Sequence, residues 1–140
     1  MLARAIDTIH RRDGGRILAG LIRRFGSFDL AEEALQDAYT RALQHWPADG
    51  IPDNPAAWLT TVARRRAVDL LRRDRRIDGD SEALLDQLAA AEVESEAPDH
   101  GVFADDQLRL IFTCCHPALA QSAQVALALR TLCRLTTAEI

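Results

Sequence analysis

The stretch that decides the fold is NPAAWLTTVARRRAVDLLRRDRR, Asn54 to Arg76, and it predicts one long helix. Asn54 is a favoured N-cap, and Pro55 suits the first helical position, where its missing N–H would have no partner in any case. Apolar residues recur on one side at a period of about 3.6 residues, which predicts a core face: Leu59, Val62, Ala63, Ala67 and Leu70. The seven arginines between positions 64 and 76 point mostly elsewhere, so this helix combines a core face with a cationic surface.

The arginines of this helix outnumber its acids. Asp69 lies four residues from both Arg65 and Arg73, so one alternative is a solvated helix supported by ion pairs between successive turns. Asp69 and Asp74 cannot neutralise seven arginines, so net positive charge remains. Planar guanidinium groups suit phosphate oxygens and guanine edges, which makes a nucleic acid the leading candidate ligand.

The composition of the chain indicates an all-α protein. Of its 140 residues, 48% are hydrophobic and only 5% aromatic, and alanine and leucine are abundant while glycine and proline are sparse. No alternating run of Val, Ile or Thr reaches the length of a strand, so helices account for the pattern. No apolar stretch approaches the ~20 residues of a membrane-spanning helix, and the N-terminus lacks the apolar core of a signal peptide. We therefore expect a cytoplasmic protein with no membrane partner.

Charge is distributed unevenly along the chain. Residues 1–76 carry 14 Arg against 10 Asp and Glu, whereas residues 77–140 carry 3 Arg against 11 Asp and Glu, and no lysine occurs. After Arg76 no basic residue appears until Arg109, while acids accumulate, which is typical of a linker. The pattern predicts a helical domain over residues 1–77, an acidic linker over 78–104 and a second, partial helical domain over 105–140.

Two helices are expected before the arginine-rich one. The first runs from about Ala3 to Phe25, with Gly14–Gly15 as a candidate break and Gly26 as its C-cap. Asp29, followed by Glu32 three positions later, is expected to start the second as a variant of the capping box. That second helix runs to Trp46 with its apolar residues at helical spacing and a polar outer face made of Glu32, Glu33, Gln36, Asp37, Thr40, Arg41 and Gln44.

A short stiff loop, residues 47–53, should deliver Asp53 and Asn54 to the start of the arginine-rich helix. Asn54 is most simply a helix cap, but an asparagine at an exposed junction beside cationic residues can also bond a base edge. Trp58 leaves a similar choice between an aromatic residue of the core and a stacking platform for an unpaired base.

The C-terminal part predicts two more helices. Asp105 or Asp106 should cap the first, which ends at His116–Pro117, and the second runs from about Leu119 to Cys133. Thr136 and Glu139 have the spacing of a capping box, which predicts the start of a further helix. The three cysteines, Cys114, Cys115 and Cys133, lack the spaced pairs of a structural zinc site, so we expect free thiols and no metal or other cofactor.

Two consecutive segments resemble the conserved domain of bacterial sigma factors of the extracytoplasmic-function group: LAEEALQDAYTRALQHW, residues 30–46, and PAAWLTTVARRRAVDLLRRDRR, residues 55–76. In that family the first of these helices grips the clamp helices of the largest RNA polymerase subunit. The positions that match its motif are Ala31, Glu32, Glu33, Gln36, Asp37, Tyr39, Arg41 and Ala42. The resemblance therefore implies polymerase-binding residues at Glu32, Glu33, Gln36, Asp37 and Arg41.

The second helix of the family melts and holds the minus-ten promoter element. Matching positions here are Trp58, Leu59, Ala63, Arg64, Asp69, Arg72 and Arg73, while Arg65 stands where the family frequently has asparagine. With the loop before the helix, the expected DNA-binding residues are Asp53, Asn54, Trp58, Arg64, Arg65, Arg72, Arg73 and Arg76.

The stretch from Asp105 to Ile140 looks like the opening of the family's second domain, which binds the minus-thirty-five element. It is especially similar to a subgroup with a long C-terminal helical extension, and the sequence ends before the recognition helix. The resemblance implies a sigma factor, truncated in its second domain, with core RNA polymerase, promoter DNA and an anti-sigma factor as candidate partners. The alternative is a truncated interaction protein that binds polymerase or an anti-sigma factor without directing initiation. An enzyme is not expected, because the four histidines are scattered without a partnered acid.

Overall fold

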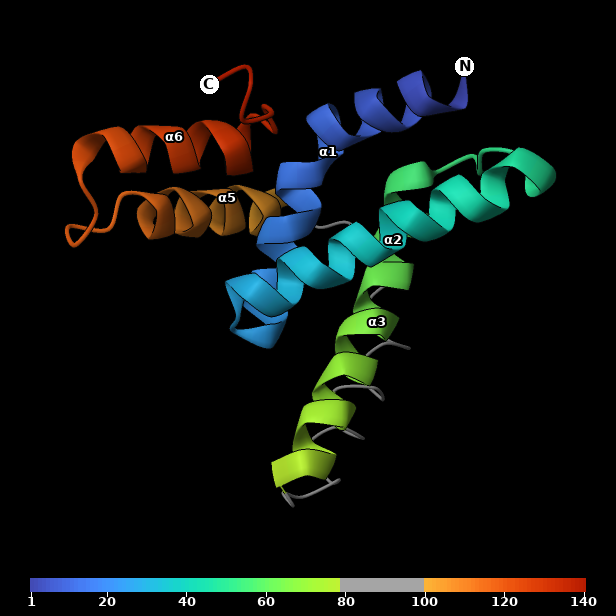
Figure 1. Ribbon diagram of the computed structural model, residues 1–140, viewed down its shortest axis with the longest axis horizontal. Coiled ribbons are helices and arrows are strands. Elements are labelled where there is room, and N and C mark those ends of the chain that lie inside the picture. The colour runs from blue at the N-terminus through green and yellow to red at the C-terminus, as the bar shows by residue number, and fades with distance from the viewer. Residues whose placement is uncertain (79–99) are drawn as a thin grey trace.

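Five helices make up the part of the chain that the computed structural model describes, residues 1–78 and 100–140. In chain order they are α1 (Leu2–Phe25), α2 (Phe28–Asp49), α3 (Pro55–Asp78), α5 (His100–Cys114) and α6 (Gln121–Leu132). The described residues contain no strand, which confirms the predicted all-α class. Figure 1 shows α2 lying across α1 and α3, with α5 and α6 side by side on the other side of α1.

Small residues let the first three helices approach closely. Ala31, Ala34, Ala38 and Ala42 form a continuous row along α2, and none of them has any surface exposed to solvent. Larger side chains from the neighbouring helices fill the space against this row, namely Leu18 and Leu21 of α1 and Leu59 of α3, with Ala63 and Ala67 continuing the α3 side. The core of this three-helix unit therefore combines small and large buried side chains, which favours tight packing.

The ends of α1 and α2 differ in part from the sequence prediction. Gly26 caps α1 in the left-handed conformation, with φ 70°, as expected. However, α1 continues through Gly14–Gly15 without a break. The N-cap of α2 is Ser27, whose Oγ accepts the Leu30 N–H at 3.3 Å, so the prediction of Asp29 as the starting residue was wrong by two positions.

The loop before α3 is shorter than predicted. Helix α2 includes Pro47 and ends at Asp49, and the Gly50 N–H donates to the Trp46 carbonyl at 3.0 Å to close the last turn. The proline removes a single N–H so near the helix end that the remaining bonds hold the turn. The connection between α2 and α3 is thus residues 50–54 rather than 47–53.

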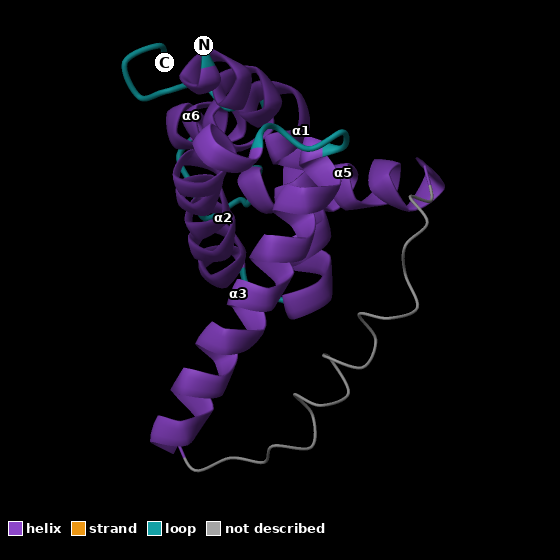
Figure 2. Cartoon of the chain, turned by 90° about the vertical axis from the view of Figure 1, so that its right-hand side faces the viewer, coloured by secondary structure: helices purple, strands orange, loops and turns teal. Residues whose placement is uncertain are grey.

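Helix α3 begins where the sequence predicted. The Asn54 Oδ1 accepts the Ala57 N–H at 3.1 Å, and Pro55 is the first helical residue. The predicted core face is confirmed for Leu59, Ala63 and Ala67, which are completely buried. Beyond them the helix extends past the other described helices, as Figures 1 and 2 both show.

Helices α5 and α6 pack on α1 rather than standing apart from it. Leu110 and Cys114 of α5 are buried, and the Cys114 Sγ lies 3.1 Å from the Thr131 Oγ1 of α6. The prediction that Asp105 or Asp106 caps α5 was wrong, because the helix starts at His100. Asp106 is instead 2% exposed and pairs with Arg23 of α1, Oδ2 to Nε, at 3.0 Å. The burial of Leu110 on α1 explains why this carboxylate, four residues earlier on the same face, turns inward.

The predicted linker falls mostly outside the described residues, namely at 79–99, and its last residues, 100–104, are helical. The division of the chain into two domains and a linker therefore stays a prediction. The turn after α5 is as expected, with the Ala118 N–H donating to the His116 Nδ1 at 3.1 Å. The Thr136 N–H and hydroxyl both donate to the Glu139 Oε2 at 2.8 Å, which confirms the local contact expected of that pair.

We predict that Asn54→Ala destabilises the protein by about 1 kcal/mol, because it leaves N–H groups of the first turn of α3 without an acceptor. Asn54→Ser should recover most of this loss, since serine is an equally favoured cap. Urea denaturation followed by circular dichroism measures both changes. Equal stability of Asn54→Ala and the original protein would show that the bond to Ala57 contributes nothing.

We also predict an alkaline loss of stability that depends on Tyr39. Burial raises the pKa of this phenol from its ordinary value of 10.0 to about 12, and nearby Arg134 opposes the shift only in part. The folded state therefore favours the neutral phenol, and the resulting stability is present below about pH 10 and is lost as pH rises towards 12.

The matched variant is Tyr39→Phe, which keeps the ring that meets His10 edge to face at a centroid distance of 4.9 Å. Between about pH 9 and 12 it should lose roughly 2 kcal/mol less than the original protein. Denaturant midpoints across this pH range measure the difference. If the stability of the two proteins falls by the same amount over this pH range, the buried hydroxyl of Tyr39 is not the cause of the alkaline loss.

Candidate nucleic-acid interface

The outward side of α3 carries exposed arginines. Arg65, Arg72 and Arg73 are all exposed, with Asp69 between them. Residues 65 and 72 are about two helical turns apart, and 73 follows directly, so the three guanidinium groups line one side of the helix. One acid among three arginines leaves this surface positively charged.

The remaining arginines of α3 are placed differently. Arg64 and Arg75 are half-buried, and the side chain of Arg76 lies outside the described part of the chain. Arg66 faces α2 and forms an ion pair there with Asp37. It occupies the position seven residues after Leu59, on the core side of the helix, where its side chain is 19% exposed. Helical periodicity alone could have separated Arg66 from the outward arginines.

The start of α3 presents two polar residues and one aromatic residue. Asp53 and Asn54 are exposed, and the Asn54 Oδ1 serves as the helix cap. Trp58 is half-buried and meets Trp46 edge to face, with ring centroids 5.3 Å apart and planes at 63°. This packing favours the interpretation of Trp58 as a residue of the core. Stacking of its exposed part on an unpaired base stays a prediction.

The polar face of α2 lies on the same three-helix unit. Glu33, Gln36 and Arg41 are exposed, whereas Glu32 and Asp37 are half-buried. The Gln36 Nε2 donates to the Glu32 Oε1 at 3.1 Å, and Asp37 pairs with Arg66. Since α2 and α3 pack against each other, the acidic face and the arginine face are held in a fixed relation. The ion pair between Asp37 and Arg66 also joins α2 to α3 directly.

Arg134 is a residue of this region that sequence reasoning missed. It follows α6, has φ 54° and is only 4% exposed. Its Nη1 lies 3.4 Å from the Glu32 Oε2, and its Nη2 donates to the Gly14 carbonyl at 3.4 Å. The one sign of this contact in the sequence was the Gly14–Gly15 pair. These glycines allow the segment that contains Arg134 to approach α1 closely, and they do not break the helix.

Two titrating groups are affected by contacts of the segment that follows α6. Burial, and secondly the positive charge of Arg134, lower the pKa of His10, so this imidazole is neutral near pH 7. Hydrogen bonds from Thr136 lower the pKa of Glu139 to about 2, with Arg11 adding an ion pair at 2.9 Å between Nη2 and Oε1. The segment after α6 is thus joined to α1 and α2 through charged side chains.

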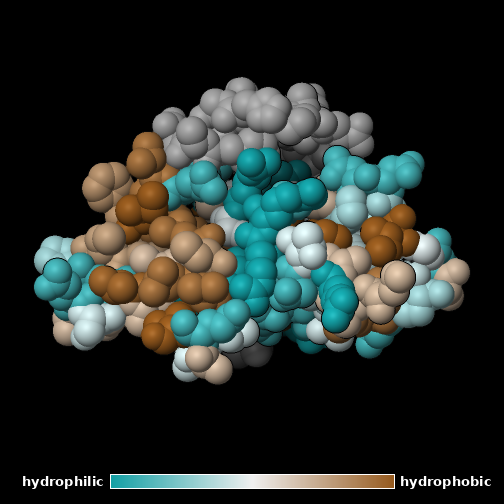
Figure 3. Space-filling model, turned by 90° about the horizontal axis from the view of Figure 1, so that it is seen from above, coloured by the Kyte–Doolittle hydropathy of each residue, from teal (hydrophilic) through white to brown (hydrophobic). Residues whose placement is uncertain are grey.

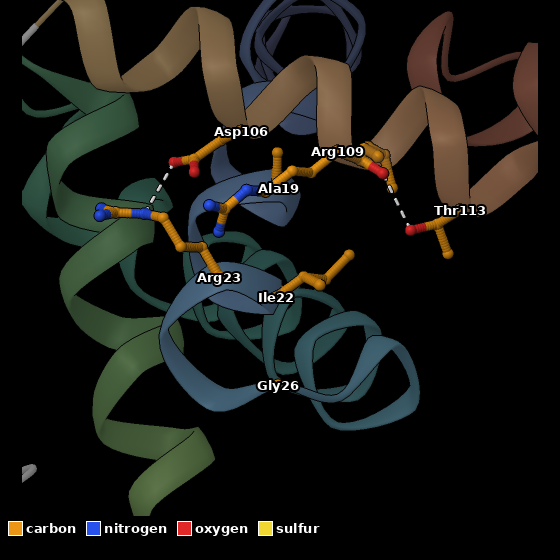
Figure 4. A pocket seen from close by; sticks show the side chains of 8 residues that line it. Ala19, Ile22, Arg23, Gly26, Asp106, Arg109 and Thr113 are labelled. Carbon is orange, nitrogen blue, oxygen red and sulfur yellow. Dashed lines mark hydrogen bonds and ion pairs between the residues drawn. The ribbon is translucent and has the colours of Figure 1, made fainter.

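A cavity of about 310 Å3 lies between α1 and α5. Figure 4 shows Arg23 and Asp106 paired across it, with Arg109 and Thr113 on the α5 side. The buried carboxylate is thus already opposed by a guanidinium, which is the arrangement of a packing contact between helices.

No group of three or more His, Cys, Asp or Glu side chains that could hold a metal ion occurs among the residues described. Cys114 is buried, and Cys115 and Cys133 are exposed free thiols. In the same part of the chain, no helix has both the length and the apolar character needed to cross a membrane.

Part of the chain is similar to a known protein family. Residues 9–77, which run from α1 into the end of α3, match the family described as Sigma-70 region 2. An uncharacterized protein of Rhizobium meliloti (strain 1021) is 43% identical over 125 residues, which cover 88% of this chain but 30% of that relative. The chain thus spans about a third of the length of the curated relative that it matches. No solved structure matches.

The matched region contains both surfaces built above, the outward arginines of α3 and the polar face of α2. Residues 9–77 are thus similar to sigma-70 region 2, and this similarity supports a sigma factor.

Proposed function

We propose that this chain acts in transcription initiation as a sigma factor of the extracytoplasmic-function group. In this proposal α2 binds the clamp helices of core RNA polymerase, and α3 holds one strand of the opened minus-ten element. The observation that carries the proposal is the rigid pairing of an exposed arginine face with an exposed acid and amide face inside one region 2 domain. Binding rather than catalysis is the activity, and the cytoplasm is where its partners occur.

The arginine face suits a DNA strand for electrostatic and geometric reasons. Phosphate contacts by Arg65, Arg72 and Arg73 would supply affinity that falls with salt concentration. Holding a melted strand also requires repayment of the few kcal/mol that each unstacked base costs, and stacking together with bonds to base edges can provide it. Asp53, Asn54 and Trp58 at the head of α3 are the proposed residues for this second role.

The polar face of α2 suits a basic protein surface. Glu33, Gln36 and Arg41 are exposed along slightly more than two turns, and Glu32 and Asp37 lie beside them. Complementary charges across such an interface set the orientation and the rate of association. A face that carries acids at its start and an arginine at its end would allow docking in one direction only.

A second candidate function is favoured by one contact, the ion pair of Arg134 with Glu32. A chain whose polymerase-binding face is partly occupied fits an interaction protein that docks on polymerase or an anti-sigma factor and regulates by competition. Run-off transcription with core polymerase separates the candidates, since a sigma factor produces promoter-dependent transcripts and a competitor reduces those of another sigma factor.

We predict that Arg65→Ala combined with Arg73→Ala weakens binding to single-stranded promoter DNA. The slope of log affinity against log salt concentration should become shallower by about 1.4, roughly 0.7 for each lost phosphate contact. Fluorescence anisotropy of a labelled oligonucleotide at several salt concentrations measures both quantities.

The matched control removes Arg4 and Arg109, two exposed arginines outside α3. It should leave the slope almost unchanged. If the two double variants lose affinity equally, the effect is one of net charge, and the assignment of α3 fails.

We predict that Glu33→Arg weakens retention on immobilised core polymerase by roughly tenfold or more, because a like charge then faces the basic partner surface. Asp49→Arg, at an exposed position near the other end of α2, makes the same charge change outside the proposed contact. Retention of the two variants at equal levels would count against the α2 face as the polymerase-binding surface.

A further inference from the structure

Two adjacent glycines in the middle of α1 are explained by the chain segment that follows α6. A glycine inside a helix is less favourable than an alanine there. A Cβ at Gly14 would lie 2.7 Å from the Arg134 Nε, and one at Gly15 would lie 3.1 Å from the Leu132 carbonyl oxygen and 3.3 Å from that of Thr131. Gly20, in the same helix, has no such neighbour within 4 Å. The Gly14–Gly15 pair therefore makes room for residues 131–134.

Arg134 is held in a conformation that it would not adopt alone. A positive φ in a residue other than glycine is strained and persists only where the surroundings determine it. Here the guanidinium is buried among Gly14, Tyr39 and Glu32. Its contacts to Glu32 and to the Gly14 carbonyl are both 3.4 Å long, near the limit of a hydrogen bond, so they orient the group without binding it tightly.

The position of Arg134 matters because Glu32 belongs to the polar face of α2. One oxygen of this carboxylate accepts from Gln36 and the other faces Arg134, so both are occupied. The Glu32 side chain is 28% exposed, so a basic group of a partner that approaches its Oε2 competes with Arg134 for this oxygen. Glu33 and Gln36 remain exposed beside it, which leaves a partner a first point of contact.

We propose that residues 131–134, docked on Gly14–Gly15 with Arg134 on Glu32, form an internal cover that competes with core polymerase for the α2 face. The inference rests on the proposed function, since it requires that Glu32 contact polymerase. Covered and uncovered states exchange, and polymerase binds the uncovered one. The apparent affinity is therefore lower than the intrinsic affinity by the fraction of molecules that are uncovered.

The test compares two glycine substitutions in one helix. Gly15→Ala forces a methyl group against the backbone of Thr131 and Leu132, whereas Gly20→Ala meets nothing, and both raise the helix propensity of α1 equally. Arg134→Gln removes the charge from the cover by an independent route. For each protein, hydrogen exchange of residues 131–136 reports docking, and titration with labelled core polymerase reports affinity.

We expect Gly15→Ala and Arg134→Gln to speed hydrogen exchange in residues 131–136 and to bind core polymerase roughly threefold or more tightly, while Gly20→Ala does neither. Faster exchange with unchanged or weaker polymerase binding would overturn the inference and leave the proposed function standing. Unchanged exchange in both variants would overturn it too, because the segment would then not be held by these contacts. Failure of every protein to bind, including variants with faster exchange, would instead refute the proposed function.

Discussion

The structure depends on the row of alanines along α2. Because Ala31, Ala34, Ala38 and Ala42 have no exposed surface, α1 and α3 can approach α2 to the distance that small side chains permit. This close packing fixes the rotation of α2 and α3 about their axes. The polar face of one and the arginine face of the other then point outward at the same time. A larger residue in the row would separate the two faces before it affected any group that contacts a partner.

Local signals in the sequence were enough to predict the elements, and tertiary contacts decided where they begin and end. The cap and core face of α3 followed from Asn54, Pro55 and the spacing of Leu59, Ala63 and Ala67. The starts of α2 and α5 did not, because Ser27 caps α2 in place of Asp29, and Asp106 lies within α5 on the face that buries Leu110. Helix α2 also continues through Pro47 to Asp49, because the hydrogen bonds of its last turn outweigh the one N–H that the proline lacks.

The surfaces could be predicted from the sequence better than the pairs that hold them. An outward arginine side of α3 and an exposed Glu33 and Gln36 follow from helical periodicity. The pairing of Asp37 with Arg66 requires knowledge of which helices are neighbours. The pairing of Glu32 with Arg134 joins residues 102 positions apart, and no local pattern predicts it. Only the two mid-helix glycines indicated that something approaches α1.

The exposed apolar side chains of the C-terminal helices contrast with this three-helix unit. Leu108, Ile111, Phe112, Leu119 and Val125 are exposed, and Figure 3 shows hydrophobic side chains gathered over α5 and α6 at the left of the view. Helix α5 also buries Leu110 and Cys114 on its inner side. It is therefore apolar on two sides, which distinguishes it from α2 and α3 with their polar outer faces.

The way α3 runs beyond its neighbours restricts how this sequence can change in length. Val68 is the last buried residue of α3 among those described, and the helix carries Arg72 and Arg73 about one turn beyond it. Each residue inserted or deleted there would swing the guanidinium groups by about 100° around the axis and shift them by about 1.5 Å along it. Length changes of three or four residues, close to a full turn, would be tolerated in orientation, and those of one or two would not.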